Sequence, residues 1–338
     1  MDTAAVDYEL PAHAIAQVPV EPRDAARLLI DRGPGRPPLH GLIPDLVTLV
    51  GPGDLVVINT TRVLPARLCT QRATGGAVEV LLLEPRDDEP GRWDALVRPS
   101  RKVAEGTRLP FGDDLLVVVG EDLGEGRRVV DLIVASGVDW LTALERHGTV
   151  PLPPYITTAL RDPERYQTTY AERPGSVAAP TAGLHLTAAV LDGIRSTGAQ
   201  VAPTELAVGL GTFRPIATER VEEHHMHAER YSVPAATMDA CQSAERVVAV
   251  GTTTVRALEA AAASGALTGR TELFIHGDRP FAVVNALMTN FHQPRSSLLV
   301  LVDALVGPRW RSLYEEALAQ GYRFLSFGDA MFLQGGRS

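Results

Sequence analysis

Residues 51–67 read GPGDLVVINTTRVLPAR, and this stretch decides the fold class that we predict. The apolar run LVVI at 55–58 follows the turn signal GPGD at 51–54, which predicts a short buried strand. The polar residues from Asn59 onward then lie at the carboxyl end of that strand, a common place for a ligand site in α/β sheets. Residues 247–250 predict a second strand, which leads through Gly251 into an alanine-rich helix ending at Ala263.

Between residues 66 and 135 the pattern changes to short β-rich runs separated by Gly, Asp and Pro turns. This predicts a small β-barrel or sandwich. The strands predicted within this region are 78–83, 93–97, 115–119 and 128–134. After it, the sequence predicts helices at 138–147, 187–197 and 309–320 and strands at 201–208 and 322–327. Strands that alternate with helices indicate an α/β layer. We therefore predict an α/β domain of residues 1–64 and 150–338, split by a β-rich insertion at 65–149.

The chain is 338 residues long with a net charge of −9, so its surface as a whole is not that of a nonspecific nucleic-acid binder. A local basic patch remains compatible with RNA binding. The longest apolar run, residues 297–307, is too short to span a bilayer, and the N-terminal residues do not resemble a secretory signal. Cys69 and Cys241 are too few for a disulfide framework, so we expect a cytoplasmic protein.

Two segments that each follow a predicted strand combine hydroxyls with arginine. In the segment 59–67, Arg62 and Arg67 could hold a carboxylate or phosphate through paired N–H donors, although solvated arginines on a surface turn explain the pattern as well. In the segment 251–256, Thr252, Thr253 and Arg256 stand at a helix start, where free N–H groups favour anions. An ordinary threonine-capped helix is the compatible alternative.

Two further segments are rich in small residues. In AAPTAGLH at 178–185, small residues let the backbone approach a ligand, and His185 could exchange protons near neutral pH. A structural histidine is the competing interpretation, and Thr187 is a candidate cap for the next helix. GLGTF at 209–213 could cradle a ligand with its backbone or form a simple tight turn.

The segment EHHMHAE at 223–229 gathers three histidines between two carboxylates. Its spacing matches no standard zinc pattern and no cysteine joins it, so proton transfer, substrate contact and surface structure are favoured over a metal site, which stays open as a minor alternative. Downstream, Asn290 could read the edge of a base and Phe291 could stack on it, although a single aromatic residue is more often part of the core. Asp329 lies in SFGDAM at 326–331 and could join the same site.

Taken in order, these segments resemble one family nearly from end to end. The matching stretches include NTTRVLPARL at 59–68, VAAPTAGLHL at 177–186, VGLGTF at 208–213, HHMHAE at 224–229, VGTTTVRALE at 250–259, TNFHQPRSSL at 289–298 and YRFLSFGDAMF at 322–332. The resemblance is to the S-adenosylmethionine:tRNA ribosyltransferase-isomerases of queuosine biosynthesis. It implies an α/β domain with an inserted β-barrel, and transfer and isomerisation of a ribosyl group onto a 7-aminomethyl-7-deazaguanine in the tRNA anticodon stem-loop.

The resemblance further implies that S-adenosylmethionine is consumed as a substrate, that no metal or nucleotide cofactor takes part, and that the protein is a monomer. The catalytic candidates are His185, His227, His292 and Glu229. The substrate-binding candidates are Asn59, Arg62, Arg67, Pro180, Thr181, Gly183, Gly209, Gly211, Thr212, Phe213, Thr252, Thr253, Arg256, Asn290, Phe291 and Asp329. Among these, Thr252, Thr253 and Arg256 are candidates for the methionine carboxylate, and Arg62 and Arg67 for RNA or that same carboxylate.

Several positions depart from the family's usual residues. Alanine replaces a usual lysine at Ala77 and Ala282 and a usual histidine at Ala207, and Asn285 replaces a usual aspartate. Fewer lysines weaken attraction for phosphate. A relative that uses a small amine or nucleoside as the acceptor therefore stays open as an alternative, as does a noncatalytic RNA- or nucleoside-binding relative.

Overall fold

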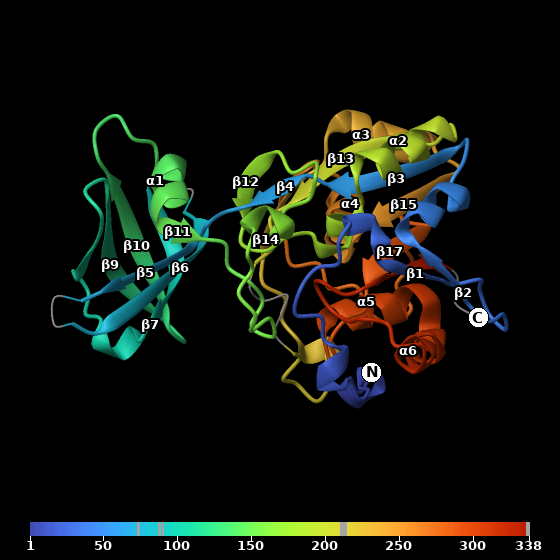
Figure 1. Ribbon diagram of the computed structural model, residues 1–338, viewed down its shortest axis with the longest axis horizontal. Helices are drawn as coiled ribbons and strands as arrows, with labels where there is room; N and C mark the ends of the chain where they lie inside the picture. Colours follow the sequence, from blue (N-terminus) through green and yellow to red (C-terminus); the bar gives the residue numbers. More distant parts are fainter. Residues whose placement is uncertain (73–74, 87–88, 90, 210–214, 336–338) are drawn as a thin grey trace. The chain divides into compact units, whose positions relative to one another are not determined.

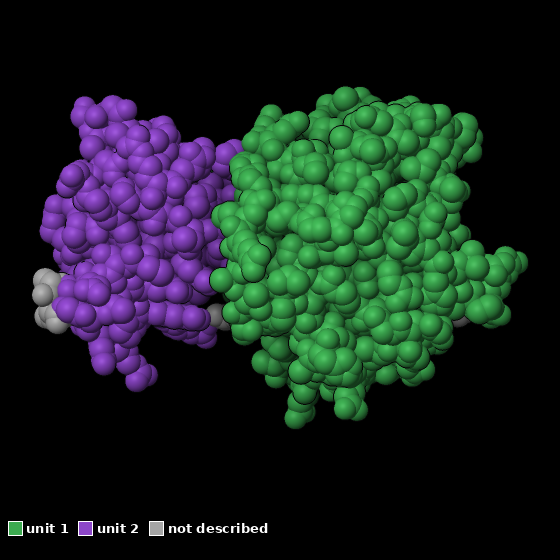
Figure 2. Space-filling view, viewed as in Figure 1, with its two compact units in different colours: residues 1–62, 153–173, 179–338 green, residues 63–152, 174–178 purple. Residues whose placement is uncertain are grey.

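The computed structural model describes residues 1–72, 75–86, 89, 91–209 and 215–335 (Figure 1). Within these residues the chain forms two compact units, drawn in different colours in Figure 2. Unit 1 comprises residues 1–62, 153–173 and 179–338, and unit 2 comprises residues 63–152 and 174–178. The chain as a whole is mixed α/β, as the sequence predicts.

Unit 1 is built on a nine-stranded sheet with the order β16-β14-β13-β3-β15-β17-β18-β1-β2. Its strands are β1 (Arg27–Ile30), β2 (Leu39–Leu42), β3 (Asp54–Asn59), β13 (Gln200–Leu206), β14 (Glu229–Ser232), β15 (Arg246–Val250), β16 (Thr268–Thr271), β17 (Ala286–Asn290) and β18 (Ala330–Gln334). The four central strands β13, β3, β15 and β17 run parallel. Their carboxyl ends therefore meet at one edge of the sheet.

The central strands β3, β15 and β17 are buried on both faces, which explains why their sequences carry continuous apolar runs rather than alternating ones. On one face, Val56 and Ile58 of β3 join a core with Leu191 and Ile194 of helix α2 (Ala188–Ser196). The alternate residue Val57 is fully buried as well. Helices α3 (Ala235–Ser243), α4 (Thr252–Ser264) and α5 (Ser297–Val306) also contact the strands, and α6 (Trp310–Ala319) contacts α5.

Unit 2 holds a seven-stranded sheet with the order β11-β5-β6-β7-β10-β9-β8, in which every pairing is antiparallel. Its strands are β5 (Arg67–Gln71), β6 (Ala77–Pro85), β7 (Arg92–Arg98), β8 (Arg108–Phe111), β9 (Leu115–Gly124), β10 (Arg127–Val134) and β11 (Gly148–Thr149), with helix α1 (Trp140–His147) following β10. The sheet curls so that β5 approaches β8, and the Thr70 hydroxyl of β5 donates to the Pro110 carbonyl of β8 over 3.2 Å. Strands β4 (Thr61–Val63) and β12 (Arg173–Ser176) form a separate pair.

Most predicted elements are found within a few residues of their expected bounds. Thr187 caps α2 as predicted, since its hydroxyl accepts from the Val190 N–H over 3.3 Å. The predicted strand at 322–327 is wrong: those residues form a buried turn, with Leu325 at a positive φ of 69°, and the strand is β18. The Asp329 carboxylate holds that turn by accepting from the Arg323 N–H over 2.8 Å.

In the described part of the chain, no helix combines the length and the apolarity needed to cross a membrane.

Candidate functional site

The predicted motif residues of unit 1 gather mainly at the carboxyl edge of its parallel strands. Asn59 ends β3, Gly251 follows β15 and Asn290 ends β17, while Gly209 lies three residues beyond the end of β13. A Cβ atom on Gly251 would lie 3.7 Å from the Cβ of Ala182, so the segment that contains His185 approaches this edge too. This is the edge at which α/β sheets bind their ligands.

Asn59 joins three elements of this edge. Its amide nitrogen donates to the Leu206 carbonyl over 3.0 Å and to the Thr253 hydroxyl over 3.2 Å. Its amide oxygen accepts from both the N–H and the hydroxyl of Thr61, over 3.1 and 3.0 Å. Since the side chain is 1% exposed and its polar atoms are hydrogen-bonded, Asn59 fixes the positions of β13 and α4.

Glu229 and Arg256 form a buried ion pair behind the same edge. The Arg256 Nη1 donates to the Glu229 Oε2, and the side chains are only 4% and 5% exposed. The other carboxylate oxygen accepts from the Gly209 N–H over 3.1 Å, and the Arg256 Nε donates to the Leu273 carbonyl over 3.3 Å. Glu229 therefore holds both the start of the predicted GLGTF cradle and the guanidinium.

The second terminal nitrogen of Arg256, Nη2, is buried and has no hydrogen-bond partner among the described residues. A buried charged donor without an acceptor costs on the order of 1–3 kcal/mol or more. An anionic ligand would remove that cost by accepting from Nη2. Arg256 is thus the residue of this edge whose unused hydrogen-bonding capacity most directly indicates a bound anion.

The first turn of α4 carries Arg256 and offers further donors. The helix begins after Gly251, which has a φ of 89° and leaves the helix without a side-chain cap. The next residues, Thr252 and Thr253, are buried at 5% and 8% exposure. Since the first N–H groups of a helix lack intrahelical acceptors, this turn suits a negative charge. The structure thus groups the predicted residues Thr252, Thr253 and Arg256 on one helix end.

His185 ends the 3₁₀ helix η7 (Thr181–His185), and its Nε2 lies 3.2 Å from the Asn290 amide nitrogen. The Asn290 amide oxygen accepts from the Thr181 hydroxyl over 2.8 Å. Burial lowers the pKa of His185 to about 4, so its ring is neutral at pH 7 and its Nε2 accepts from Asn290. His185, Asn290 and the half-buried Thr181 form one hydrogen-bonded chain that ends at the strand edge.

His292 and Phe291 lie in the core of unit 1. Phe291 is fully buried and stacks on Phe324 with ring centroids 4.6 Å apart. The His292 Nε2 lies 3.0 Å from the Thr289 hydroxyl, and burial lowers the pKa of His292 to about 3. The ring of Phe291 therefore packs against other aromatic rings, and His292 is a neutral buried group at pH 7.

His227 differs from these histidines because its side chain is exposed. It lies two residues before Glu229, which contacts Arg256 and Gly209. Burial lowers the pKa of the nearby His224, and repulsion from His227 and His225 adds to this shift. Within the described ranges, no group of three or more His, Cys, Asp or Glu side chains is arranged to hold a metal ion.

The other predicted residues take several positions. Arg62 pairs with Glu164 over 2.5 Å, and Asp329 accepts from the N–H groups of Arg27 and Arg323, so both make structural contacts. Arg67 belongs to unit 2, where its Nε lies 3.7 Å from Glu79. The remaining predicted residues are Pro180 and Gly183, which lie in the buried η7 segment, and Gly211, Thr212 and Phe213, which lie outside the described residues.

Sequence reasoning missed Arg23, which positions the His185 segment. Its Nη1 donates to the carbonyls of Gln167 and Leu184 over 2.7 and 3.2 Å. Arg23 lies in EPRDAARLL at 21–29, a further stretch that resembles the family, so the resemblance could have identified it, but no local pattern indicates its hydrogen-bond partners.

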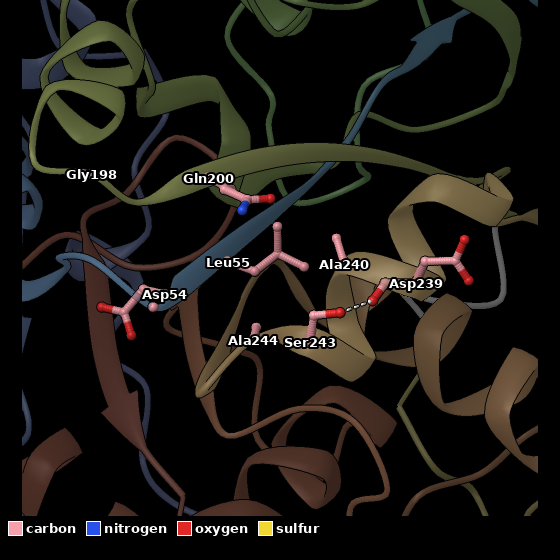
Figure 3. A pocket seen from close by; sticks show the side chains of 9 residues that line it. Asp54, Leu55, Gly198, Gln200, Asp239, Ala240, Ser243 and Ala244 are labelled. Atoms are coloured by element: carbon pink, nitrogen blue, oxygen red, sulfur yellow. Dashed lines mark hydrogen bonds between the residues drawn. The ribbon is translucent and has the colours of Figure 1, made fainter.

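A cavity of about 270 Å³ lies at the opposite, amino-terminal edge of the sheet (Figure 3). Figure 3 shows Ala240 and Ser243 of α3 across from Leu55 and Gln200 of β3 and β13. None of the predicted site residues lines it. We therefore place the candidate site at the carboxyl edge, where the buried polar groups converge.

Comparison with known proteins gives consistent matches along the chain. The family described as queuosine biosynthesis protein matches residues 3–333. The S-adenosylmethionine:tRNA ribosyltransferase-isomerase of Rubrobacter xylanophilus is 50% identical over 337 residues, which cover 99% of this chain and 98% of that protein. The protein of the same name from Gloeobacter violaceus is 48% identical over 349 residues, covering 98% and 95%.

One solved structure is similar over almost its whole length. The crystal structure of S-adenosylmethionine tRNA ribosyltransferase from Thermotoga maritima shares 35% sequence identity with a TM-score of 0.55. The match covers 97% of this chain and 99% of that one.

Proposed function

The chain belongs to the family of queuosine biosynthesis proteins, and we propose that it is an S-adenosylmethionine:tRNA ribosyltransferase-isomerase. It transfers and isomerises the ribosyl moiety of S-adenosylmethionine onto 7-aminomethyl-7-deazaguanine in tRNA, which gives epoxyqueuosine and releases adenine and methionine. The observation that carries this proposal is the match of nearly the whole chain to relatives of that name at about half identity. A relative with a small acceptor, or without activity, has no comparable support.

The proposal includes the domain organisation. The curled seven-stranded sheet of unit 2 supports an inserted β-barrel domain at 65–149, with residues 1–64 and 150–338 as the catalytic α/β domain. The enzyme acts as a monomer in the cytoplasm, on S-adenosylmethionine and the anticodon stem-loop of tRNA. No metal or nucleotide cofactor enters this chemistry.

Arg256 and the first turn of α4 bind the methionine carboxylate of S-adenosylmethionine. The buried Nη2 of Arg256 supplies a charged donor, and Thr252 and Thr253 supply the N–H groups of an uncapped helix start. Glu229 positions that guanidinium, because its two oxygens accept from Arg256 and from the Gly209 N–H. A carboxylate engaged in this way serves better as a positioning residue than as the general base.

His227 is the proton-transfer group that we propose. The sulfonium of S-adenosylmethionine acidifies the neighbouring C5′ hydrogens, so a base there forms an ylide, and adenine leaves more readily when its ring is protonated. The His227 side chain is exposed and therefore accessible to a substrate, whereas burial lowers the pKa of His185 to about 4 and that of His292 to about 3, which keeps both rings neutral at pH 7. His185 instead holds Asn290, which together with Thr181 contacts the substrate.

The direct test incubates the protein with S-adenosylmethionine and tRNA that carries the 7-aminomethyl-7-deazaguanine base. Mass spectrometry follows adenine release and the mass of the tRNA. Adenine release coupled to the epoxyqueuosine mass supports the proposal. A folded protein that binds S-adenosylmethionine but modifies no tRNA contradicts it.

A pair of variants tests the role of His227. We expect His227→Asn to lower kcat about 100-fold or more, the usual size of a lost general acid or base, with little change in KM for S-adenosylmethionine. His225→Asn is the matched control, because His225 is also exposed in the same segment. Exchange of the C5′ hydrogens with deuterated solvent, measured without tRNA, isolates the first step. If His227→Asn keeps the kcat of the control, His227 has no part in proton transfer.

A further inference from the structure

The cations of unit 2 fall into two groups. Most arginines pair with a carboxylate within 4 Å: Arg67, Arg86, Arg92, Arg127, Arg128 and Arg146. The others make no ion pair among the described residues, and they all lie between residues 72 and 108: Arg72, Arg98, Arg101, Lys102 and Arg108. We call this second group the basic seam.

The curl of the sheet brings the basic seam together. Arg72 follows β5 and Arg108 begins β8, and these strands meet where the Thr70 hydroxyl donates to the Pro110 carbonyl. Because every neighbouring pair in the sheet is antiparallel, β5 and β8 run in opposite directions, which sets Arg72 opposite Arg108.

The 3₁₀ helix η5 (Ser100–Lys102) adds the remaining charges. The Arg72 Nη1 donates to the Lys102 carbonyl over 3.0 Å, so η5 lies against the end of β5. Arg98, the last residue of β7, stands two residues before this helix, and Arg98, Arg101 and Lys102 are all exposed. Five positive charges thus share one end of the curled sheet.

Acidic residues lie at the same end, but among the described residues none forms an ion pair with the seam. Glu79 pairs in register with Arg98, but its carboxylate lies 3.7 Å from Arg67. The exposed Asp122 carboxylate lies 3.6 Å from Arg128, whose Nη1 also donates to the Val103 carbonyl next to η5. The seam contains Lys102, the only lysine of a chain whose net charge is −9. Five clustered cations without ion-pair partners repel one another, and a polyanion bound to the cluster would relieve that repulsion.

We infer that the basic seam binds the phosphate backbone of the tRNA substrate. This inference rests on the proposed function and assigns the RNA-contacting surface on unit 2. Arginine and lysine side chains contact phosphates without reading sequence, so the seam supplies affinity and orientation, and recognition of the modified base takes place at the catalytic site.

The test measures binding of fluorescently labelled tRNA by anisotropy at several salt concentrations, which needs no turnover. The variant is Arg101→Ala/Lys102→Ala. The matched control is Arg127→Ala/Arg146→Ala, which removes two cations from the same unit, both already paired with aspartates. We expect the seam variant to raise Kd about tenfold and to lower the slope of log Kd against log salt by about 1–2, as loss of two phosphate contacts requires. The control is expected to change Kd less than about twofold.

The outcomes separate this inference from the proposed function. If the wild-type protein releases adenine with tRNA but the seam variant binds tRNA with an unchanged slope, the inference is wrong and the function stands. The inference is also wrong if the control weakens binding as much as the seam variant, because binding then follows net charge. If tRNA binds through the seam without any adenine release, the inference stands and the proposed function is wrong.

Discussion

Removing the charge of Glu229 should destabilise unit 1 strongly. The Glu229 and Arg256 side chains are 5% and 4% exposed, so water screens neither charge when its partner is lost. Breaking a buried ion pair on one side costs about 3–5 kcal/mol, because the remaining charge stays buried without compensation. We expect Glu229→Gln to fall at the lower end, near 3 kcal/mol, since the amide oxygen can still accept from the Gly209 N–H.

A double-mutant cycle identifies the source of that loss. Arg256→Met should cost a similar amount, whereas Glu229→Gln/Arg256→Met should cost about 2–3 kcal/mol less than the sum, because no unpaired charge remains. Urea unfolding followed by circular dichroism at 222 nm reports on unit 1, which contains α2 to α6. With a slope near 3 kcal/mol per molar, a loss of 3 kcal/mol moves the midpoint by about 1 M.

The control for this cycle is the exposed pair Arg195–Asp192 on α2, whose side chains are 52% and 74% exposed. Its removal by Arg195→Ala should cost less than about 0.5 kcal/mol. A loss below about 1 kcal/mol in Glu229→Gln, or additive single losses in the cycle, would refute the argument that the pair is buried and coupled.

Two further predictions concern the histidine side of the site. Gly183→Ala should destabilise unit 1 by about 1–3 kcal/mol in urea unfolding, because the new Cβ would lie 2.1 Å from the Tyr170 hydroxyl oxygen. Tyr170→Phe removes that oxygen and should relieve part of the loss. Equal losses from Gly183→Ala with Tyr170 and with Phe at position 170 would contradict the clash. Acid should also destabilise the fold: burial lowers the pKa of His185 to about 4 and of His292 to about 3, so only the unfolded chain takes up these protons just below pH 6.5. From about pH 6 to pH 4 each histidine should add about 1.4 kcal/mol per pH unit to the slope of unfolding free energy, and a His185→Gln variant with an unchanged slope would show that His185 is not the source.

The sequence predicted the elements whose local pattern matches their environment. The apolar runs at 55–58 and 247–250 are buried strands because both sheet faces are covered, and no polar alternation is needed. Asn59 and Gly251 stand at the carboxyl ends of these two strands, as expected, and because the strands prove to be parallel both residues lie at one edge of the sheet. The predictions of these two strands depend only on local apolar composition, which a sequence shows directly, whereas the direction of the strands is seen only in the structure.

Long-range pairing was not predictable in the same way. The sequence offered Glu229 as a catalytic candidate because its ion pair with Arg256, 27 residues further along the chain, cannot be recognised from the local pattern. The segment 322–327 looked like a strand because a fully buried turn has the same apolar composition as a buried strand. Burial likewise separates His227 from His185 and His292, although the three are alike as isolated residues.

The place of β18 in the sheet has a consequence for synthesis on the ribosome. β18 lies between β17 and β1, and β1 and β2 join the sheet only through it. β1 and β2, which are synthesised first, therefore cannot pair with the rest of their sheet until β18, which ends at residue 334, has emerged from the ribosome. The strands of unit 2 end at residue 149 and need no later strand of the sheet, so this unit can fold while the rest of the chain is still being made. The early strands β1 and β2 are thus the part of the nascent chain most in need of protection from aggregation.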